Sequence, residues 1–499
     1  MQPDPDSNGY ICAKASNAPA ESVGLSRSDE LLGGTLPPEF LQVPALPPSA
    51  GNDISFSRVA GADRHLESLP MEEVPAPTRT SRSSWSELSV ARPLTIALLM
   101  VTAAVIVFAH RVDAFTYPQF YAEDGTRWFT AAYNLGPLQA LDAASAGSLQ
   151  VVSRLGAVLA APFGLTNQPL VYNLCGLLVQ LAPVFYFLSS RFETVVPKFW
   201  LRMVLSLVYL LMPDNELNVT ITLAPVHLII LATLVVLASQ PNRWYWKVFD
   251  ASTVLLCGLS GPFVFILFPI TALWYLVRRR RFTLVLLGVL AVTLAVQLYV
   301  SRVSPRADVN PGGGLGNLLL ILSDRIILPG IFGEPGHRNV YLAEQTHETV
   351  YAGLICLAAL AVVAYSATRA PWELRLFGLT SAGIAVAGLL SPLVSFTGNQ
   401  WLIMATSDAA GRYFFMARLA WLVTLIWALS RLPSAWMRRT AWVAGGLAFA
   451  SGFATWGYTP FANYDWPREA RAIQTAAPGT KLTLPINPGG PWAVEITVK

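Results

Sequence analysis

The stretch FTLVLLGVLAVTLAVQLYV, residues 282–300, decides the fold class because it contains no charged side chain. A helix of about 20 apolar residues crosses the hydrocarbon core of a bilayer. Residues 94–108 and 350–367 have the same uncharged, apolar character. These segments predict an all-α polytopic membrane protein.

The composition of the whole chain agrees with that prediction. Of 499 residues, 54% are hydrophobic and only 13% are charged, whereas soluble proteins carry about 25% charged residues. The net charge of +4 is too small to indicate a nucleic-acid partner. Membrane lipids are the expected surroundings.

Basic residues around the apolar segments set the expected topology. Four arginines, 278–281, immediately precede the 282–300 stretch, and short cytoplasmic loops are enriched in Lys and Arg. Applied to every loop, this rule places the N-terminus in the cytoplasm and the C-terminus outside, with about eleven crossings (10–12). The expected helices are 94–110, 170–189, 199–213, 223–239, two short helices within 248–277, 282–301, 347–368, 376–397, 411–430 and 441–457.

The N-terminal residues 1–90 contain eleven of the 36 prolines and no helical or strand periodicity. We expect a disordered cytoplasmic tail. No charged segment followed by a short apolar run opens the chain, so we expect no cleavable secretory signal. A start of translation at Met71 is the alternative explanation of this tail.

Beyond the N-terminal tail, the longer polar segments are expected outside. The membrane domain, 91–458, contains two long extracytoplasmic loops, 111–169 and 302–346, and each holds an amphipathic stretch suited to the membrane surface, 149–163 and 315–332. Residues 459–499 form an extracytoplasmic tail, in which the alternating runs 481–486 and 494–498 predict a small β element.

Two adjacent carboxylates are the main catalytic candidates. Glu123 and Asp124 occur in the sequence Tyr121-Ala122-Glu123-Asp124-Gly125, shortly after the first helix on the outer side. Partial burial of one carboxylate beside the other raises a pKa and creates a general base for a substrate hydroxyl. The alternative is a solvated turn, or acids that favour the start of a helix.

The position of this motif resembles that of the GT-C superfamily of integral membrane glycosyltransferases. The resemblance covers residues 94–457 in topology but only 121–125 in motif. It implies that the first outer loop supplies the catalytic carboxylate and that the donor is a sugar on a polyprenyl phosphate or pyrophosphate. The contiguous acids depart from the Asp-x-Asp or Glu-x-Asp spacing of some branches, and Asp124 is preferred to Glu123 as the base.

A second candidate site lies at the outer mouth of the helix 411–430. Arg412 offers a planar guanidinium that binds phosphate oxygens in pairs, and Tyr413 with its aromatic neighbours could flank an isoprenoid chain. The resemblance also implies an arginine on the carrier phosphate. The alternative is an interfacial anchor within an aromatic belt.

Further polar residues occupy the outer loops. Arg127 and the cluster 334–338, with His337 and Arg338, are candidates for contacts to the leaving phosphate or the acceptor. The histidine spacing does not indicate a metal, and we expect no cofactor. His227, inside a predicted membrane helix, is either functional or bonded to a neighbouring carbonyl group.

These observations favour a glycosyltransferase of a bacterial inner membrane. Its expected partners are a lipid-linked sugar donor and an extracytoplasmic glycan or lipid acceptor, with inversion at the anomeric carbon. A transporter or flippase should carry more ionisable residues in mid-helix and some internal symmetry. That class and a non-catalytic subunit of an envelope polysaccharide complex remain the alternatives.

Overall fold

The computed structural model describes residues 88–144, 147–212, 214, 216–306, 309–333, 345–395, 398–407, 410–451 and 460–499. The expected disordered tail, except for its last residues, lies outside these ranges. Residues 88–499 form one compact unit.

The described chain is mostly helical, and a helix occurs at each place where the sequence predicts a span. The break expected within 248–277 is confirmed, because α8 ends at Leu259 and α9 begins at Val264. The longer helices are α1 (Leu88–His110), α5 (Gln168–Leu188), α10 (Arg281–Val303), α13 (Gln345–Arg369), α14 (Trp372–Leu390) and α16 (Gly411–Ser430). The shorter ones are α6 (Phe199–Leu210), α7 (Ala224–Leu237), α8 (Trp244–Leu259), α9 (Val264–Arg278) and α17 (Ala435–Ser451).

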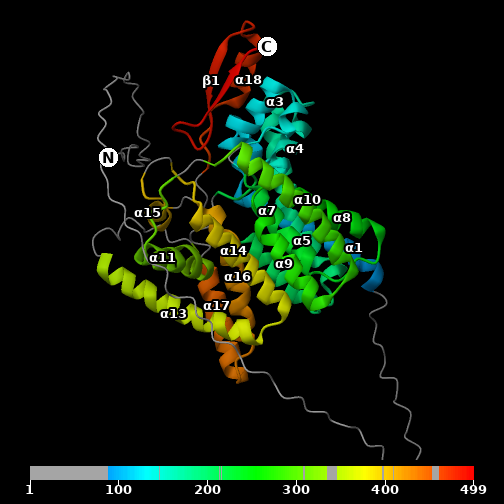
Figure 1. Cartoon of the computed structure of the whole chain (residues 1–499), viewed down its shortest axis with the longest axis vertical. Helices are drawn as coiled ribbons and strands as arrows, with labels where there is room; N and C mark the ends of the chain where they lie inside the picture. Colours follow the sequence, from blue (N-terminus) through cyan, green and yellow to red (C-terminus); the bar gives the residue numbers. More distant parts are fainter. Residues whose placement is uncertain are drawn as a thin grey trace, which may run out of the picture. The chain divides into compact units, whose positions relative to one another are not determined.

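Helix α7 lies at the centre of the helical bundle. It contacts α5 on one side and α8 on another, while α10 packs against α8 and α9, and α14 packs against α16 (Figure 1). Nearly every residue of α7 is buried. A helix that is apolar on all sides is expected in such a position.

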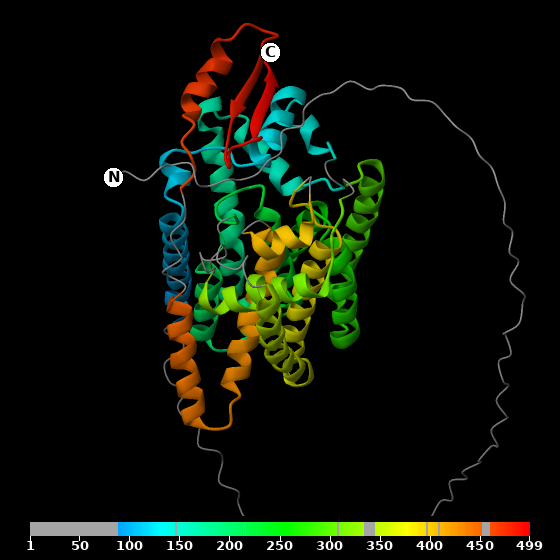
Figure 2. The same ribbon diagram turned by 90° about the vertical axis from the view of Figure 1, so that its left-hand side faces the viewer.

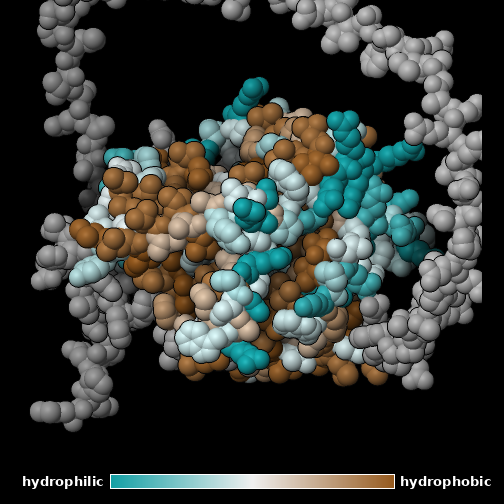
Figure 3. All heavy atoms as spheres, turned by 90° about the horizontal axis from the view of Figure 1, so that it is seen from below, coloured by the Kyte–Doolittle hydropathy of each residue, from teal (hydrophilic) through white to brown (hydrophobic). Residues whose placement is uncertain are grey.

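Within the described part of the chain, six helical segments are long and apolar enough to cross a membrane, which indicates a multi-pass membrane protein. Several present large exposed apolar side chains, including Leu284 and Val292 of α10 and Leu354 and Leu357 of α13. Figure 3 shows broad apolar areas of the surface with hydrophilic groups between them. Such areas are too large for a soluble monomer and fit a surface that faces lipid.

One of the six segments is expected at the membrane surface and not across the membrane. Residues 315–332 form one continuous helix, built from α11 (Leu315–Ile321), the π-helix η5 (Leu322–Ile327) and α12 (Leu328–Phe332). The sequence predicts a helix on the membrane surface here, whereas its length and composition also allow a crossing. Its residue Ser323 is fully buried, so the helix is packed within the protein on at least one side.

The first long loop is folded into short helices. They are α2 (Asp113–Thr116), the π-helix η1 (Asp124–Phe129), α3 (Thr130–Leu135), η2 (Gln139–Leu141), α4 (Val151–Ala160) and η3 (Leu165–Asn167). The amphipathic stretch expected at 149–163 corresponds to α4.

The expected β element of the C-terminal segment is confirmed. Strands β1 (Lys481–Pro485) and β2 (Ala493–Thr497) pair antiparallel, with Leu484 opposite Val494. The preceding helix α18 (Trp466–Thr475) was not predicted. Strand β2 contacts α3 and η1, and α18 contacts η3, so the C-terminal segment and the first loop lie together at one end of the bundle (Figure 2).

Candidate functional site

Asp124 is the first residue of the π-helix η1 and is completely buried. Its Oδ1 atom accepts two hydrogen bonds from Thr222, one from the backbone N–H at 2.9 Å and one from the hydroxyl at 2.6 Å. Its Oδ2 atom is buried and has no hydrogen-bond partner among the described residues. Buried carboxylate oxygens normally have partners, and π-helical turns are frequent at functional sites.

A relay of side chains fixes the position of Thr222. Its hydroxyl accepts a hydrogen bond from the Trp128 indole N–H at 3.0 Å. The guanidinium of Arg154 lies 4.9 Å from the centre of the Trp128 ring and donates to the carbonyl groups of Leu149 and Ala140. Helix α4 therefore supports the tryptophan that orients the threonine.

Burial changes the acidity of the catalytic candidate. Loss of hydration raises the pKa of Asp124 from 3.8 to about 7, while the Thr222 hydrogen bonds oppose the increase and the charge of Glu123 adds to it. This matches the expectation of one carboxylate made basic by burial and by its neighbour. A carboxyl group of this pKa exchanges its proton near neutral pH.

The neighbouring Glu123 has a different environment. Its side chain is partly exposed, and its charge acts on Arg412 together with that of Glu216. The structure thus brings the acidic motif and the predicted phosphate-binding arginine to the same end of the bundle. Asp124 is completely buried, whereas Glu123 is partly exposed to solvent.

Arg412 and Arg306 lie on either side of Tyr413. Arg412 donates to the Leu393 carbonyl oxygen at 2.7 Å, lies 3.7 Å from Glu216, and has its guanidinium 5.0 Å from the centre of the Tyr413 ring. Arg306 donates to the Tyr413 hydroxyl at 2.9 Å. Sequence reasoning missed Arg306, although an arginine on the outer side runs against the charge bias just as Arg412 does.

Helix α16 begins against the segment that carries Thr222. A Cβ atom on Gly411 would lie 2.6 Å from Oδ2 of Asp214, so only glycine allows this approach. Two turns further along α16, Arg418 forms a buried ion pair with Asp214 at 3.5 Å. These contacts join α16, which carries Arg412, to the segment that carries Thr222, the residue bonded to Asp124.

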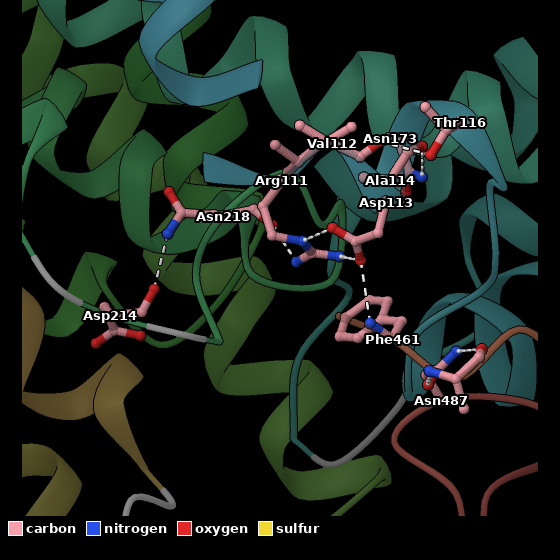
Figure 4. A network of polar contacts seen from close by, with 12 residues as sticks. Arg111, Val112, Asp113, Ala114, Thr116, Asn173, Asp214, Asn218, Phe461 and Asn487 are labelled. Carbon is pink, nitrogen blue, oxygen red and sulfur yellow. Dashed lines mark hydrogen bonds and ion pairs between the residues drawn. The ribbon is translucent and has the colours of Figure 1, made fainter. Parts of the chain in front are cut away.

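The same segment is attached to the end of α1 by Arg111 (Figure 4). Arg111 donates to the Asn218 carbonyl oxygen at 2.9 Å and forms a buried ion pair with Asp113 at 3.0 Å. Asp113 in turn accepts a hydrogen bond from the backbone N–H of Phe461. Three segments distant in sequence are therefore fixed to one another beside the acidic motif.

His227 has two partners inside the protein. Its Nδ1 atom lies 2.7 Å from the Tyr209 hydroxyl and its Nε2 atom lies 3.0 Å from the Leu217 carbonyl oxygen. Because that carbonyl can only accept, Nε2 carries a proton. The Tyr209 hydroxyl, which has one proton, lies within hydrogen-bond distance of both Nδ1 and the Gln180 carbonyl oxygen, the latter at 2.8 Å. Of the two alternatives, the structure shows the bond to a neighbouring carbonyl group.

The other predicted residues are less closely connected with the site. Arg127 lies on η1 and is partly exposed. Burial, and then the charge of Arg127, lowers the pKa of Arg154 to about 10. His337 and Arg338 lie outside the described residues. Within the described part of the chain, no group of three or more His, Cys, Asp or Glu side chains is suited to a metal ion.

The comparisons with known proteins give no family assignment. No protein-family model matches the chain, and no curated protein matches it significantly. The functional argument therefore rests on the geometry of the site.

Proposed function

We propose that the protein is a membrane glycosyltransferase of the GT-C type, which moves a sugar from a polyprenyl phosphate or pyrophosphate to an extracytoplasmic glycan or lipid hydroxyl. The observation that carries the proposal is the meeting of two unlike groups at one end of the bundle. Asp124 is a buried carboxyl group with a pKa of about 7, and the charge of its neighbour Glu123 acts on Arg412.

Each of the two groups would have its own role in the reaction. Asp124, through its unpartnered Oδ2, takes the proton of the acceptor hydroxyl as that oxygen forms a bond to the anomeric carbon. The bond from the anomeric carbon to the phosphate oxygen breaks, and one displacement inverts the configuration. Arg412 and Arg306 stabilise the negative charge that develops on the departing lipid phosphate.

Access to Asp124 requires a rearrangement, since the side chain is completely buried. Glu123, which is partly exposed beside Arg412, is the alternative base if Asp124 serves only to anchor Thr222. The proposal places both acids on the extracytoplasmic side of the membrane. With the N-terminus in the cytoplasm of a bacterial cell, it requires an odd number of crossings, and eleven is the expected number.

The decisive experiment compares envelope glycans and polyprenyl-linked sugars by mass spectrometry. Cells carry the wild-type chain, a deletion, Asp124→Asn or Glu123→Gln, and the amount of each variant in the membrane is measured in parallel. Asn keeps an oxygen that can accept both Thr222 hydrogen bonds, so Asp124→Asn removes basicity with little change of shape.

We expect one glycan to lose a sugar in the deletion and in Asp124→Asn, while the lipid-linked donor accumulates. If the glycan loses its sugar in Glu123→Gln but not in Asp124→Asn, Glu123 is the base. If the deletion changes the glycans and neither carboxylate variant does, the chain acts as a transporter, a flippase or a scaffold, and the transferase proposal fails.

A further inference from the structure

The C-terminal segment 460–499 is bonded directly to the backbone of the acidic motif. The Asn487 carbonyl oxygen accepts a hydrogen bond from the Ala122 backbone N–H at 2.7 Å, and Tyr121 and Asn487 form an isolated parallel bridge. The Asn487 side chain is buried and bonds both the N–H and the carbonyl oxygen of Ala462, each at 2.9 Å. This asparagine thus connects two parts of the tail with the motif.

The motif needs such support because of its backbone conformation. Ala122 has a φ of +47°, in the left-handed region that non-glycine residues adopt only when the surrounding structure imposes it. Its N–H is the one that bonds to Asn487. The next two residues along the chain are Glu123 and Asp124, so the direction of both carboxylates depends on this turn.

Side-chain packing reinforces the connection from two directions. The rings of Tyr121 and Phe461 are stacked, with centroids 5.0 Å apart and planes within 5°. A Cβ atom on Gly125 would lie 2.7 Å from Ile486 and 2.9 Å from Val494. The glycine therefore allows the hairpin to lie directly on the start of η1 and to exclude water from it.

We infer that residues 460–499 are a positioning element for the acidic motif, in which Asn487 fixes the turn that aims Glu123 and Asp124 and the hairpin residues Ile486 and Val494 cover it. The structural part of this inference is independent of the reaction. Its catalytic consequence rests on the proposed function.

Hydrogen exchange on the full-length protein in lipid nanodiscs tests the positioning role. Asn487→Ala removes the side-chain bonds that hold the tail, and Val494→Ala removes methyl groups above Gly125. We expect exchange in the peptide 121–128 to become roughly tenfold faster in both variants, with the transmembrane helices unchanged. The matched control is Glu495→Gln, since Glu495 lies on the exposed face of β2.

Unchanged exchange at 121–128 in both variants would overturn the inference. If Asn487→Ala also speeds exchange in the transmembrane helices, the comparison of Val494→Ala with Glu495→Gln decides. Faster exchange at 121–128 in Val494→Ala supports the inference, and unchanged exchange there overturns it. Neither result depends on sugar transfer, so failure of the proposed function is recognised separately.

The pH dependence of transfer supplies the catalytic readout. Loss of the hairpin cover hydrates Asp124, so the midpoint at which transfer rises with pH should move below the wild-type value near 7 in Val494→Ala. A variant that merely reduced the amount of folded protein would lower the rate and leave the midpoint unchanged. That result would refute positioning as the catalytic role of the tail.

Discussion

Thr222 gives both of its hydrogen bonds to a single oxygen of Asp124, its backbone N–H at 2.9 Å and its hydroxyl at 2.6 Å. The other oxygen, Oδ2, is left buried and without a partner among the described residues. Because Oδ1 already accepts two hydrogen bonds, the proton of the neutral carboxyl group lies on Oδ2. The geometry therefore separates a fixed side of the carboxyl group from a reactive side.

The first prediction concerns Thr222→Val. This change removes the hydroxyl but keeps the size of the side chain and the backbone N–H. Because the Thr222 hydroxyl lowers the pKa of Asp124, its loss should raise that pKa further. We expect the midpoint of the pH–rate profile for sugar transfer to rise above 7 and the rate at pH 7 to fall several-fold.

Thr222→Ser is the matched control, because serine restores the hydroxyl to within reach of Oδ1. The profile of that variant should return to the wild-type midpoint. A midpoint that is the same in the valine, serine and wild-type proteins would mean that Asp124 is not the group that titrates in the reaction.

The second prediction concerns stability as a function of pH. The pKa of Asp124 is about 7 in the folded protein against an ordinary 3.8. The folded state therefore binds more protons than the unfolded state between these values, and stability is lost as the pH rises through this window. Across this pH window, the deprotonation of Asp124 lowers the free energy of unfolding by about 4 kcal/mol.

Asp124→Asn removes this titration. We expect the melting temperature of the wild-type protein, measured in nanodiscs, to fall from pH 5 to pH 8 more steeply than that of the variant. Differences between the two curves isolate Asp124 from other titrating groups. Parallel curves would show that Asp124 keeps an ordinary pKa and is hydrated in solution.

The third prediction concerns the two arginines beside Tyr413. Arg306 donates a hydrogen bond to the Tyr413 hydroxyl and would contact a phosphate with its remaining N–H groups. Arg306→Ala should raise the KM for a polyprenyl-phosphate sugar about tenfold or more, since hydrogen bonds to charged groups contribute about 1.5–3 kcal/mol. Arg412→Ala should act in the same direction.

Arg302→Ala is the control for Arg306, because Arg302 is exposed near the end of α10. It should leave the KM for the lipid donor within twofold of the wild-type value. An equal increase in the Arg302 variant would reflect a general loss of positive charge and would contradict a specific site at Arg306.

The helices could be predicted from the sequence because each one depends on local composition. Uncharged apolar runs identify the spans, and the glycines and proline at 258–262 mark the end of α8 and the start of α9. Helix ends were less accurate, since α14 ends at Leu390 and not near 397. Helix α18 was missed because only ten residues form it and its stability comes from packing of Trp466.

The candidate site was predicted only in part, for a physical reason. Glu123, Asp124 and Arg412 bear the charged side chains on which the proposal rests, so composition and position mark them as candidates. Thr222 and Asn487 act through contacts across the fold, and Thr222 is 98 residues from Asp124 in the chain. No local pattern distinguishes such a threonine or asparagine from others in a loop.

The last prediction concerns which side of the membrane carries the site. The hydrogen bond between Ala122 and Asn487 requires the first loop and the C-terminal segment to lie on the same side. The distribution of Lys and Arg predicts that this side is extracytoplasmic. Cysteines introduced singly at Leu138 and Glu495, both exposed positions, should therefore react with a membrane-impermeant thiol reagent added to intact spheroplasts.

The background for this experiment lacks the native cysteines, and a cysteine in place of exposed Trp244, at the start of α8, is the control for the cytoplasmic side. It should react only after the membrane is permeabilised. Reaction of positions 138 and 495 only after permeabilisation, with position 244 reacting in intact spheroplasts, would invert the orientation and remove the site from the proposed acceptors. Reaction of positions 138 and 495 from opposite sides would contradict the contact itself, because no membrane protein can form that hydrogen bond across the bilayer.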